Sequence, residues 1–462
     1  MAQKDDSVPT GRIRRAAKLG GLAGKEAARG AAVRARTVGR GEQRRIALEE
    51  WQIQAAEQAV EVLGSMKGLA MKAGQVASFL DTGLLEPEAN ARIQAKLAEL
   101  RDSAPRVSFE EMRKVIESDL GEPLEDVFSE FNEDSIAAAS IGQVYRAKLE
   151  DGREVAVKVQ YPGVGAAVRA DLQNIGLIMR IAKRIAPGMD AKAMATELRE
   201  RLTEELDYEA EAQHQREFAR RFRGHPFVHV PEVVTSLTRE RVLVQEFVEG
   251  AGFDEVKRLP QDERDRFGEI VFRFFFRSLY GFQHFSGDPH PGNYLLRPDG
   301  RVTFLDYGMT KRLAKGSTNK HLELVRALVT DDEDAALANV VGRGMYREGD
   351  DRVTGRRVLD QFRQISWYLR DEELTVDNDL VVQVALEFGD PRSENWDMQK
   401  RGTMPPDSMM PARMEILTAG VLAQLEARAN WSRIFREIAF GEPPATALGE
   451  QEAGFWGGRR AA

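Results

Sequence analysis

Apolar side chains in the first hundred residues are spaced as in helices. They recur at helical intervals from about residue 41 to residue 100, after a stretch rich in Arg, Ala and Gly over residues 1–40. A further helix is predicted from Ser108, because Ser108 and Glu111 have the spacing of a capping box. The pattern changes only after Asp134.

The spacing after Asp134 is that of strands. Residues 143–150 and 153–160 both look extended, and Asp151-Gly152 between them predicts a two-residue hairpin turn. On the second strand, three valines share one face and Lys158 lies on the other. We therefore expect an antiparallel pair of strands here.

Helical and extended segments alternate in the next part of the chain. Helical spacing returns over residues 164–186 and 191–222, and a strand is predicted over 241–248. Residues 269–282 are apolar apart from a narrow polar stripe, which predicts a largely buried helix. A loop rich in Pro, Gly, His and Asp follows at 286–293.

The C-terminal part is predicted to be mostly helical. Two short strands flank the turn Arg297-Pro298-Asp299-Gly300, helices dominate from Leu313, and a frayed tail is expected from Gly441. This order of elements indicates two lobes, one containing strands and one helical. The expected regions are a basic arm (1–50), a helical extension (51–130), a strand-containing lobe (131–248), a helical lobe (249–440) and a C-terminal tail (441–462).

Composition narrows the possible chemistry. Of the 462 residues, 42% are hydrophobic and 30% are charged, so the chain can bury a sizeable core. It contains no cysteine. That excludes a disulfide scaffold, a thiolate zinc site, a cysteine-ligated iron–sulfur cluster and a cysteine nucleophile.

Charge is distributed unevenly. The net charge is −8, yet residues 1–50 hold 12 basic and 6 acidic side chains, which puts +6 on the arm and −14 on the rest. An acidic body argues against a nucleic-acid surface, so no nucleic-acid partner is expected. The basic arm is expected to make peripheral contact with an anionic membrane; the alternative is a disordered, solubilising tail.

No run of 18 apolar residues is present, so no transmembrane helix is expected. The N-terminus also lacks the apolar stretch of a signal peptide. These two observations predict a cytoplasmic protein, which the arm would bring to the inner face of a membrane.

Three groups of residues carry candidate chemistry, and the first is Lys158. It follows Val155-Ala156-Val157 on an apolar strand. If it is buried, it needs a carboxylate or phosphate partner, because an unpaired buried ammonium is strongly destabilising. The alternative is a lysine that faces solvent on a half-exposed strand.

The second group is the loop Asp288-Pro289-His290-Pro291-Gly292-Asn293. A carboxylate can orient or deprotonate a hydroxyl, and an amide oxygen suits Mg²⁺. A structural Pro/Gly turn is the alternative. No second histidine lies at ligand spacing from His290, so a transition-metal site is not expected there.

The third group is Asp306-Tyr307-Gly308, which directly follows the strand predicted over 302–305 and presents a carboxylate at its end.

The order of these groups is the layout of protein-kinase-like phosphotransferases. In that layout a strand lysine holds the nucleotide phosphates and a helix glutamate holds the lysine. A loop aspartate positions the acceptor hydroxyl, while an asparagine and the aspartate of Asp-x-Gly hold Mg²⁺. The predicted fold is therefore α+β, a two-lobed protein-kinase-like fold with a helical N-terminal extension.

Further motifs make the resemblance more specific. Together they closely resemble the UbiB family of atypical protein-kinase-like proteins, also called the AarF-domain family, over about residues 60–310. The motifs are Met71-Lys72-Ala73-Gly74-Gln75, Ala137-Ala138-Ala139-Ser140-Ile141-Gly142-Gln143-Val144-Tyr145, Lys158-Val159-Gln160-Tyr161-Pro162-Gly163-Val164, Glu205-Leu206-Asp207-Tyr208-Glu209-Ala210-Glu211-Ala212 and Gly287-Asp288-Pro289-His290-Pro291-Gly292-Asn293.

The resemblance implies ATP and Mg²⁺ as cofactors, ATPase or unorthodox kinase activity, and a role in isoprenoid-lipid or quinone metabolism such as ubiquinone biosynthesis. It makes Asp288, Lys158 and Glu211 the catalytic residues, and Asn293 and Asp306 the metal ligands. The predicted ATP-binding residues are Ala137, Ala138, Ala139, Ser140, Lys158, Glu246 and Val248. The predicted cleft-covering, regulatory residues are Lys72, Gly74, Gln75, Glu205 and Asp207.

Two of these assignments have alternatives. Glu209 or Glu205 could pair with Lys158 in place of Glu211, which is preferred because the family motif places it there. Alanines stand at 137–139 where ordinary kinases have glycines; their Cβ atoms restrict the backbone, so the nucleotide should sit differently. This stretch could instead be the start of an alanine-rich helix.

The sequence departs from some family members at two places. Ser286-Gly287 precedes Asp288 where many relatives have His-Ala, and His214 stands where an asparagine is common.

The predicted function is an ATP- and Mg²⁺-dependent atypical kinase or ATPase, with ATP and an isoprenoid lipid or quinone precursor as partners. The alternatives are a catalytically silent, pseudokinase-like scaffold that binds nucleotide or lipid, and a small-molecule phosphotransferase on the same fold.

Overall fold

The structure is a computed structural model that describes residues 107–139, 141–173, 196, 199, 203, 204, 206–389, 395–399 and 401–460. The chain divides into two compact units, one of residues 1–106 and 163–203 and the other of residues 107–162 and 204–462. In the first unit, helix α8 spans Val164–Leu172. The predictions for the basic arm and for Lys72, Gly74, Gln75, Ser140 and Glu205 lie outside the described residues.

The second unit begins with the helix that the capping box predicts. Helix α6 (Phe109–Leu120) starts after Ser108, whose side chain accepts from the Glu111 N–H while the Glu111 carboxylate accepts from the Ser108 N–H. It ends at Gly121, which has φ 84°. This prediction is confirmed.

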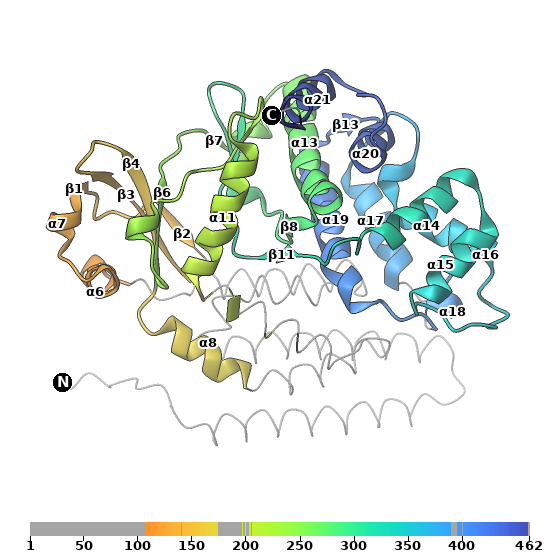
Figure 1. The fold of residues 1–462 in the computed structure, drawn as a ribbon, viewed down its shortest axis with the longest axis horizontal. Helices are drawn as coiled ribbons and strands as arrows, with labels where there is room; N and C mark the ends of the chain where they lie inside the picture. Colours follow the sequence, from red (N-terminus) through yellow and green to blue (C-terminus); the bar gives the residue numbers. More distant parts are fainter. Residues whose placement is uncertain are drawn as a thin grey trace, which may run out of the picture. The chain divides into compact units, whose positions relative to one another are not determined.

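An antiparallel sheet follows, in the order β1–β3–β4–β6, with β2 also paired to β3 (Figure 1). Its strands are β1 (Phe128–Phe131), β2 (Ala137–Ala139), β3 (Gly142–Leu149), β4 (Glu154–Gln160) and β6 (Val242–Glu246), and helix α7 (Leu124–Val127) precedes β1. The three valines of β4 share one hydrophobic core with α6. The alternation of the strand therefore turns Lys158 to the other face of the sheet.

The hairpin between β3 and β4 forms where it was predicted, but its loop has three residues and not two. Gly152 N–H donates to the Leu149 carbonyl, and Leu149 N–H donates to the Arg153 carbonyl. Glu150, Asp151 and Gly152 thus lie between the last paired residues. Gly152 has φ 86°, which a residue without Cβ adopts readily and which is typical of a three-residue hairpin loop.

Helix α11 (Tyr208–Phe222) lies beside the sheet (Figure 1), on the side that Lys158 faces, because Lys158 Nζ donates to Glu211 of this helix. It begins at an N-cap, because the Asp207 carboxylate accepts from the N–H groups of Glu209 and Ala210 at 3.0 and 3.1 Å. In the described part of the helical run predicted over 191–222, a separate helix therefore starts at Tyr208.

The remainder of the unit is mainly helical, with short strands that carry loops of the predicted site. The helices are α12 (Phe253–Val256), α13 (Gln261–Phe276), α14 (Asn319–Thr330), α15 (Glu333–Gly342), α16 (Gly355–Ile365), α17 (Asn378–Gly389), α18 (Trp396–Gln399), α19 (Pro406–Leu425), α20 (Trp431–Phe440) and α21 (Ala447–Arg460). The strands are β5 (Val228–His229), β7 (Ala251–Gly252), β8 (His284–Ser286), β9 (Tyr294–Leu296), β10 (Val302–Phe304), β11 (Thr310–Arg312), β12 (Leu374–Thr375) and β13 (Arg428–Ala429). Short 3₁₀ helices span Thr235–Leu237, Pro291–Asn293 and Trp367–Leu369.

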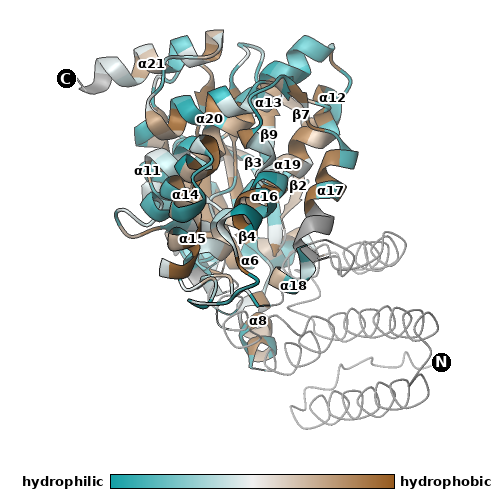
Figure 2. Ribbon diagram, turned by 90° about the vertical axis from the view of Figure 1, so that its right-hand side faces the viewer, coloured by the Kyte–Doolittle hydropathy of each residue, from teal (hydrophilic) through white to brown (hydrophobic). Residues whose placement is uncertain are grey.

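Helix α13 is the buried helix of this part. Ten consecutive residues, Phe267–Phe276, are buried, as the apolar pattern predicts. The helix begins at Gln261, eight residues before the predicted start, and continues as the π-helical turn Arg277–Gly281. Teal turns of α14 and α16 in Figure 2 show where helices of the same part present polar residues.

The prediction of a frayed tail from Gly441 is wrong, because residues 447–460 form α21. Glu452 on this helix is 1% exposed, and its carboxylate lies 2.9 Å from Arg273 Nη1 and 3.2 Å from Arg277 Nη2. These ion pairs join residues that are 175 or more positions apart, so local sequence does not reveal them.

Among the described residues, no helix has the length and apolar run that crossing a bilayer requires.

Candidate functional site

Lys158 and Glu211 form an ion pair between the sheet and α11. Lys158 Nζ donates to the two Glu211 carboxylate oxygens at 2.8 and 3.0 Å, and the side chains are 17% and 3% exposed. The lysine also lies 4.9 Å above the centre of the Tyr208 ring. Glu209 is exposed on the other side of α11, so the structure pairs the lysine with Glu211. The solvent-facing alternative for Lys158 is wrong.

The pair forms because of how α11 is placed. Asp207 caps the helix, and Tyr208, Glu211, Ala212 and Gln215 then fall on its buried face at helical spacing. Of the two predicted cleft-covering residues at its start, Asp207 therefore has a structural role as the cap, whatever else it contacts.

A second carboxylate, that of Asp306, acts on the same pair. Burial opposes the charge of Lys158, but Glu211 and Asp306 outweigh it and raise the pKa of the ammonium above its ordinary value. Burial raises the pKa of Glu211, Asp306 adds to that rise, and Lys158 opposes it. Lys158 is therefore charged, and two carboxylates share one ammonium.

Asp306 is held by a tight turn directly after β10. The Asp306 carboxylate accepts from the Gly308 N–H at 2.8 Å. The Tyr307 N–H of this turn donates to the Glu211 carboxylate, which joins the turn to α11. Tyr307 is buried between them, with its ring 5.1 Å from that of Phe218.

The loop after β8 places Asp288 three residues before a 3₁₀ turn and Asn293 at the last residue of that turn. Asp288 N–H donates to Ser286 Oγ at 3.3 Å, and its carbonyl accepts from the His290 N–H at 2.8 Å. The Asn293 carbonyl accepts from the Leu305 N–H at 3.0 Å. That bond joins the loop to the residue before Asp306, so the two predicted metal ligands lie on hydrogen-bonded neighbouring segments.

His290 has a local role. Its side chain is exposed, and its Nδ1 accepts from the Gly292 N–H at 3.1 Å. Across the described residues, no three His, Cys, Asp or Glu side chains are grouped as a metal site would need.

Residues 137–139 form the strand β2, so the alternative of a helix start is wrong. Ala137 pairs with Val144 and Ala139 with Gly142. A Cβ at Gly142 would lie 2.0 Å from the Val159 carbonyl oxygen on β4. Glycine is therefore required on β3, while the strand opposite it carries alanines.

Of the two nucleotide-contacting residues predicted at β6, Glu246 already has partners within the protein. The Glu246 carboxylate lies 3.3 Å from His229 Nε2 and accepts from the Glu232 N–H at 3.2 Å. Val248 follows the strand and is partly buried. The Glu246 carboxylate is therefore engaged within the protein, and nucleotide contacts at Glu246 and Val248 stay a prediction.

Sequence reasoning missed two contacts at or next to the Asp288 loop. Arg413 on α19 lies 3.2 Å from Asp288 through Nη2 and Oδ1, with side-chain exposures of 9% and 14%. His214 Nδ1 lies 3.0 Å from His284 Nε2, which joins α11 to β8. Burial, with Arg312 and His214 next, lowers the pKa of His284 to about 3, so its ring is neutral. Both contacts join residues at least 70 positions apart, and no local pattern marks them.

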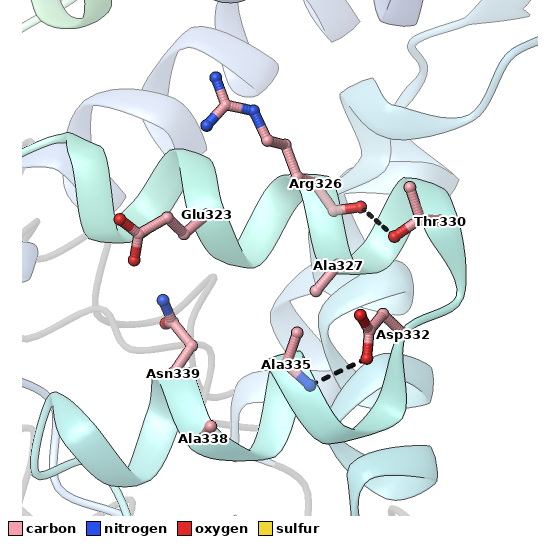
Figure 3. Close-up of a pocket in the computed structure, with 8 residues that line it drawn as sticks. All are labelled: Glu323, Arg326, Ala327, Thr330, Asp332, Ala335, Ala338 and Asn339. Carbon is pink, nitrogen blue, oxygen red and sulfur yellow. Dashed lines mark hydrogen bonds between the residues drawn. The ribbon is translucent and has the colours of Figure 1, made fainter.

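A hollow of about 470 Å³ lies elsewhere, between α14 and α15 (Figure 3). The two hydrogen bonds drawn in Figure 3 each lie within one helix or its cap. Thr330 Oγ1 donates to the Arg326 carbonyl, and Ala335 N–H donates to the Asp332 carboxylate. None of its lining residues belongs to the groups described above, so it is not part of the candidate site.

Comparison with known proteins agrees with this arrangement. Residues 99–340 match the family model of the ABC1 atypical kinase-like domain. The chain is 33% identical over 337 residues to rat "Atypical kinase COQ8B, mitochondrial", covering 72% of this chain and 63% of that protein. It is 26% identical over 472 residues to "Atypical kinase coq-8, mitochondrial" of Caenorhabditis elegans, covering 95% and 59%. The chain thus spans less than two thirds of these curated relatives.

A solved structure is also similar. It is the complex of Rv3197 with erythromycin from Mycobacterium tuberculosis, with a TM-score of 0.62 and 31% identity, covering 84% of this chain and 97% of that one. Together with the family match over more than half of the chain, this similarity shows that the chain belongs to the ABC1 atypical kinase-like family, the UbiB or AarF family, and has its kinase-like fold.

Proposed function

We propose that this chain binds Mg-ATP at the site of Lys158, Glu211 and Asp306 and acts as an atypical kinase or ATPase. The observation that carries the proposal is the Lys158–Glu211 ion pair at 2.8 Å, with the main chain of the Asp306 turn hydrogen-bonded to the same glutamate through Tyr307. In kinase-like phosphotransferases, a lysine held in this way contacts the nucleotide phosphates.

The residues of the site fit Mg²⁺. The Asp306 carboxylate and the Asn293 amide oxygen are hard ligands, and the bond between Leu305 N–H and the Asn293 carbonyl keeps their segments adjacent. Two carboxylates beside one ammonium also favour an added cation. When bound, the metal would neutralise charge on the phosphoryl group.

The other residues then have separate roles. Lys158 would hold the phosphates and Glu211 would hold Lys158. Asp288 would orient an acceptor hydroxyl or a water molecule. The strand Ala137–Ala139, with Ser140, would approach the nucleotide, and main-chain groups at Glu246 and Val248 would contact it. Lys72, Gly74, Gln75, Glu205 and Asp207 would cover the cleft, which disfavours a protein as the acceptor.

Isoprenoid-lipid or quinone metabolism is the proposed setting, and it is supported by the likeness to the UbiB family. The test is ATP hydrolysis by the purified chain, with and without anionic liposomes and isoprenoid quinone precursors. Turnover that these additions stimulate supports the proposal. A Mg-ATP-induced thermal shift without turnover under any of these conditions would instead favour the catalytically silent scaffold. Stoichiometric phosphorylation of a small molecule would favour the small-molecule phosphotransferase.

The basic arm is proposed to place the protein at the inner face of a membrane. Its net +6 stands against −14 on the rest of the chain. Each Lys or Arg near an anionic bilayer can contribute about 1 kcal/mol, which fades beyond a Debye length of about 8 Å at physiological salt. Co-sedimentation with anionic vesicles should fall at high salt and on deletion of residues 1–40. Binding that survives the deletion, or ignores lipid charge, would refute the role of the arm.

A further inference from the structure

The carboxylate of the catalytic loop contacts a helix outside the matched family domain. Arg413 Nη2 lies 3.2 Å from Asp288 Oδ1, and both side chains are largely buried, at 9% and 14% exposed. Arg413 is on α19, residues 406–425, whereas the family match ends at residue 340. The contact therefore brings to the loop a residue that the family match does not cover.

A second side chain of α19 packs on the same loop. A Cβ at Gly287 would lie 2.2 Å from the terminal methyl of Met410. Gly287 thus leaves the space that Met410 fills. Met410 and Arg413 are three residues apart and so share a face of the helix. That face is turned toward Gly287 and Asp288.

Helix α19 is itself held along its length. Near its start, Arg343 Nη2 donates to Ser408 Oγ at 2.7 Å. In its middle, the Tyr280 hydroxyl donates to the Glu415 carboxylate at 2.5 Å. At its end, Arg264 Nη1 donates to the Leu425 carbonyl at 2.6 Å. A helix fixed at three points is a rigid base for a side chain that must hold another group in place.

We propose that Arg413 is a positioning residue, which restrains the Asp288 carboxylate in the orientation that the acceptor hydroxyl or water requires. The inference rests on the proposed function, in which Asp288 orients the acceptor. A charge-assisted hydrogen bond from a planar guanidinium restrains a carboxylate more strongly than a neutral donor does. A displacement of about 1 Å at a reacting group can lower the rate about a hundredfold.

The test compares Arg413→Met and Arg413→Lys with the parent chain in steady-state ATP hydrolysis. With Met, kcat should fall about ten- to a hundredfold while KM stays within about threefold, because the nucleotide contacts are untouched. With Lys, part of kcat should return. Methylguanidinium added to Arg413→Ala should raise kcat for the same reason. The control is Arg356→Met, which removes a 47% exposed arginine paired with Asp331 and Glu333 and should leave kcat within about threefold of the parent.

Three results would overturn the inference. An unchanged kcat in Arg413→Met would make the contact structural, and a raised kcat would make it inhibitory. If Met, Lys and Ala variants all fail to fold, Arg413 is again structural. The proposed function fails separately, and the inference with it, if the parent chain shows neither a Mg-ATP-induced thermal shift nor turnover. If the parent turns ATP over and Arg413→Met does so equally, only the inference fails.

Discussion

Arg273 and Lys158 are both cations held by glutamates, but they are held differently. All five N–H groups of Arg273 donate, at 2.7–3.0 Å, and its side chain is fully buried. The acceptors are Glu269, Glu437, Glu452 and Thr446. Lys158 donates to Glu211 and remains 17% exposed. One cation is enclosed by protein acceptors, and the other is open to a ligand.

The carboxylates report the same difference. Burial alone would raise the pKa of Glu452, but His225, Arg277 and Arg273 outweigh burial and lower it. At Glu211, burial and Asp306 together raise the pKa despite Lys158. We call Glu269, Arg273, Arg277, Glu437 and Glu452 the Arg273 network, and Lys158, Glu211 and Asp306 the Lys158 site. In the Arg273 network, cations compensate the buried carboxylates. In the Lys158 site, Glu211 and Asp306 repel each other, and a bound cation would reduce that repulsion.

The largest expected effect is on the Arg273 network. Arg273→Met leaves Glu269, Glu437 and Glu452 without their common partner, and removing one side of a buried ion pair typically costs about 3–5 kcal/mol. Urea unfolding measures this loss. Arg356→Met is the control, because Arg356 is 47% exposed in its ion pair with Asp331 and its loss should cost less than about 1 kcal/mol. Equal losses in both variants would contradict the comparison.

Asp306→Asn should act strongly on nucleotide binding and weakly on stability. Losing the anionic ligand should weaken Mg-dependent ATP binding by about a hundredfold, since even an outer-shell partner of a metal contributes 10–100-fold. Losing the charge relieves its repulsion with Glu211 but also removes its attraction to Lys158, so the unliganded stability should change by less than about 1 kcal/mol. Thermal-shift titrations with Mg-ATP, and with ATP plus EDTA, measure both effects. An unchanged Mg-ATP shift would refute the metal assignment.

Lys158→Met should weaken ATP binding by about ten- to a hundredfold. The estimate is a lost hydrogen bond to a charged group, about 1.5–3 kcal/mol. Its cost in stability should be smaller than that of Arg273→Met, because Lys158 is partly exposed and water can reach the glutamate it leaves. Calorimetric titration and urea unfolding check the two parts. Full ATP affinity in the variant would remove Lys158 from the proposed site.

Glu415 extends the comparison to a carboxylate with no cation among its principal partners. Burial raises the pKa of Glu415 to about 7, although the hydroxyls of Tyr280 and Tyr368 oppose the rise. The folded state therefore holds a proton that the unfolded state releases near its ordinary pKa of 4.5, so stability falls as pH rises from about 4.5 to about 7. The side chain is partly exposed, and we expect a loss on the order of 1–2 kcal/mol.

The measurement is urea unfolding of the parent and Glu415→Gln at pH 5 and pH 8. The variant lacks the titrating group, so it should gain stability relative to the parent at pH 8. A difference between the two proteins that is the same at both pH values would show that Glu415 does not titrate in this range.

The sequence predicts interactions between neighbouring residues better than interactions between residues that are far apart along the chain. The capping box of Ser108 and Glu111 and the hairpin around Gly152 depend on neighbouring residues, and both form where they were predicted. The two-residue loop was wrong because one further residue, Glu150, joins the turn. Local rules thus predict the element better than its boundary.

The pairing at the site could be predicted only with the family motif. Several acids lie near the start of α11, and periodicity alone does not separate Glu209 from Glu211. The position of the N-cap at Asp207 decides which carboxylate is buried. Arg413 and Glu452 were out of reach because each meets its partner through the packing of helices distant in sequence.

The smallest expected effect concerns β2, beside the Lys158 site. Ala139→Gly removes a Cβ and should let the main chain approach the phosphates, so we expect ATP to bind more tightly, by less than about tenfold. Ala138→Gly is the matched control, since it lies in the same strand but on the opposite face and pays the same cost in backbone entropy. Both variants should lose about 0.5–1 kcal/mol of stability, and only Ala139→Gly should change nucleotide affinity or turnover. Identical affinity and turnover in the parent and Ala139→Gly would exclude a phosphate contact by this strand and leave the Lys158 site as the proposed phosphate-binding part of the molecule.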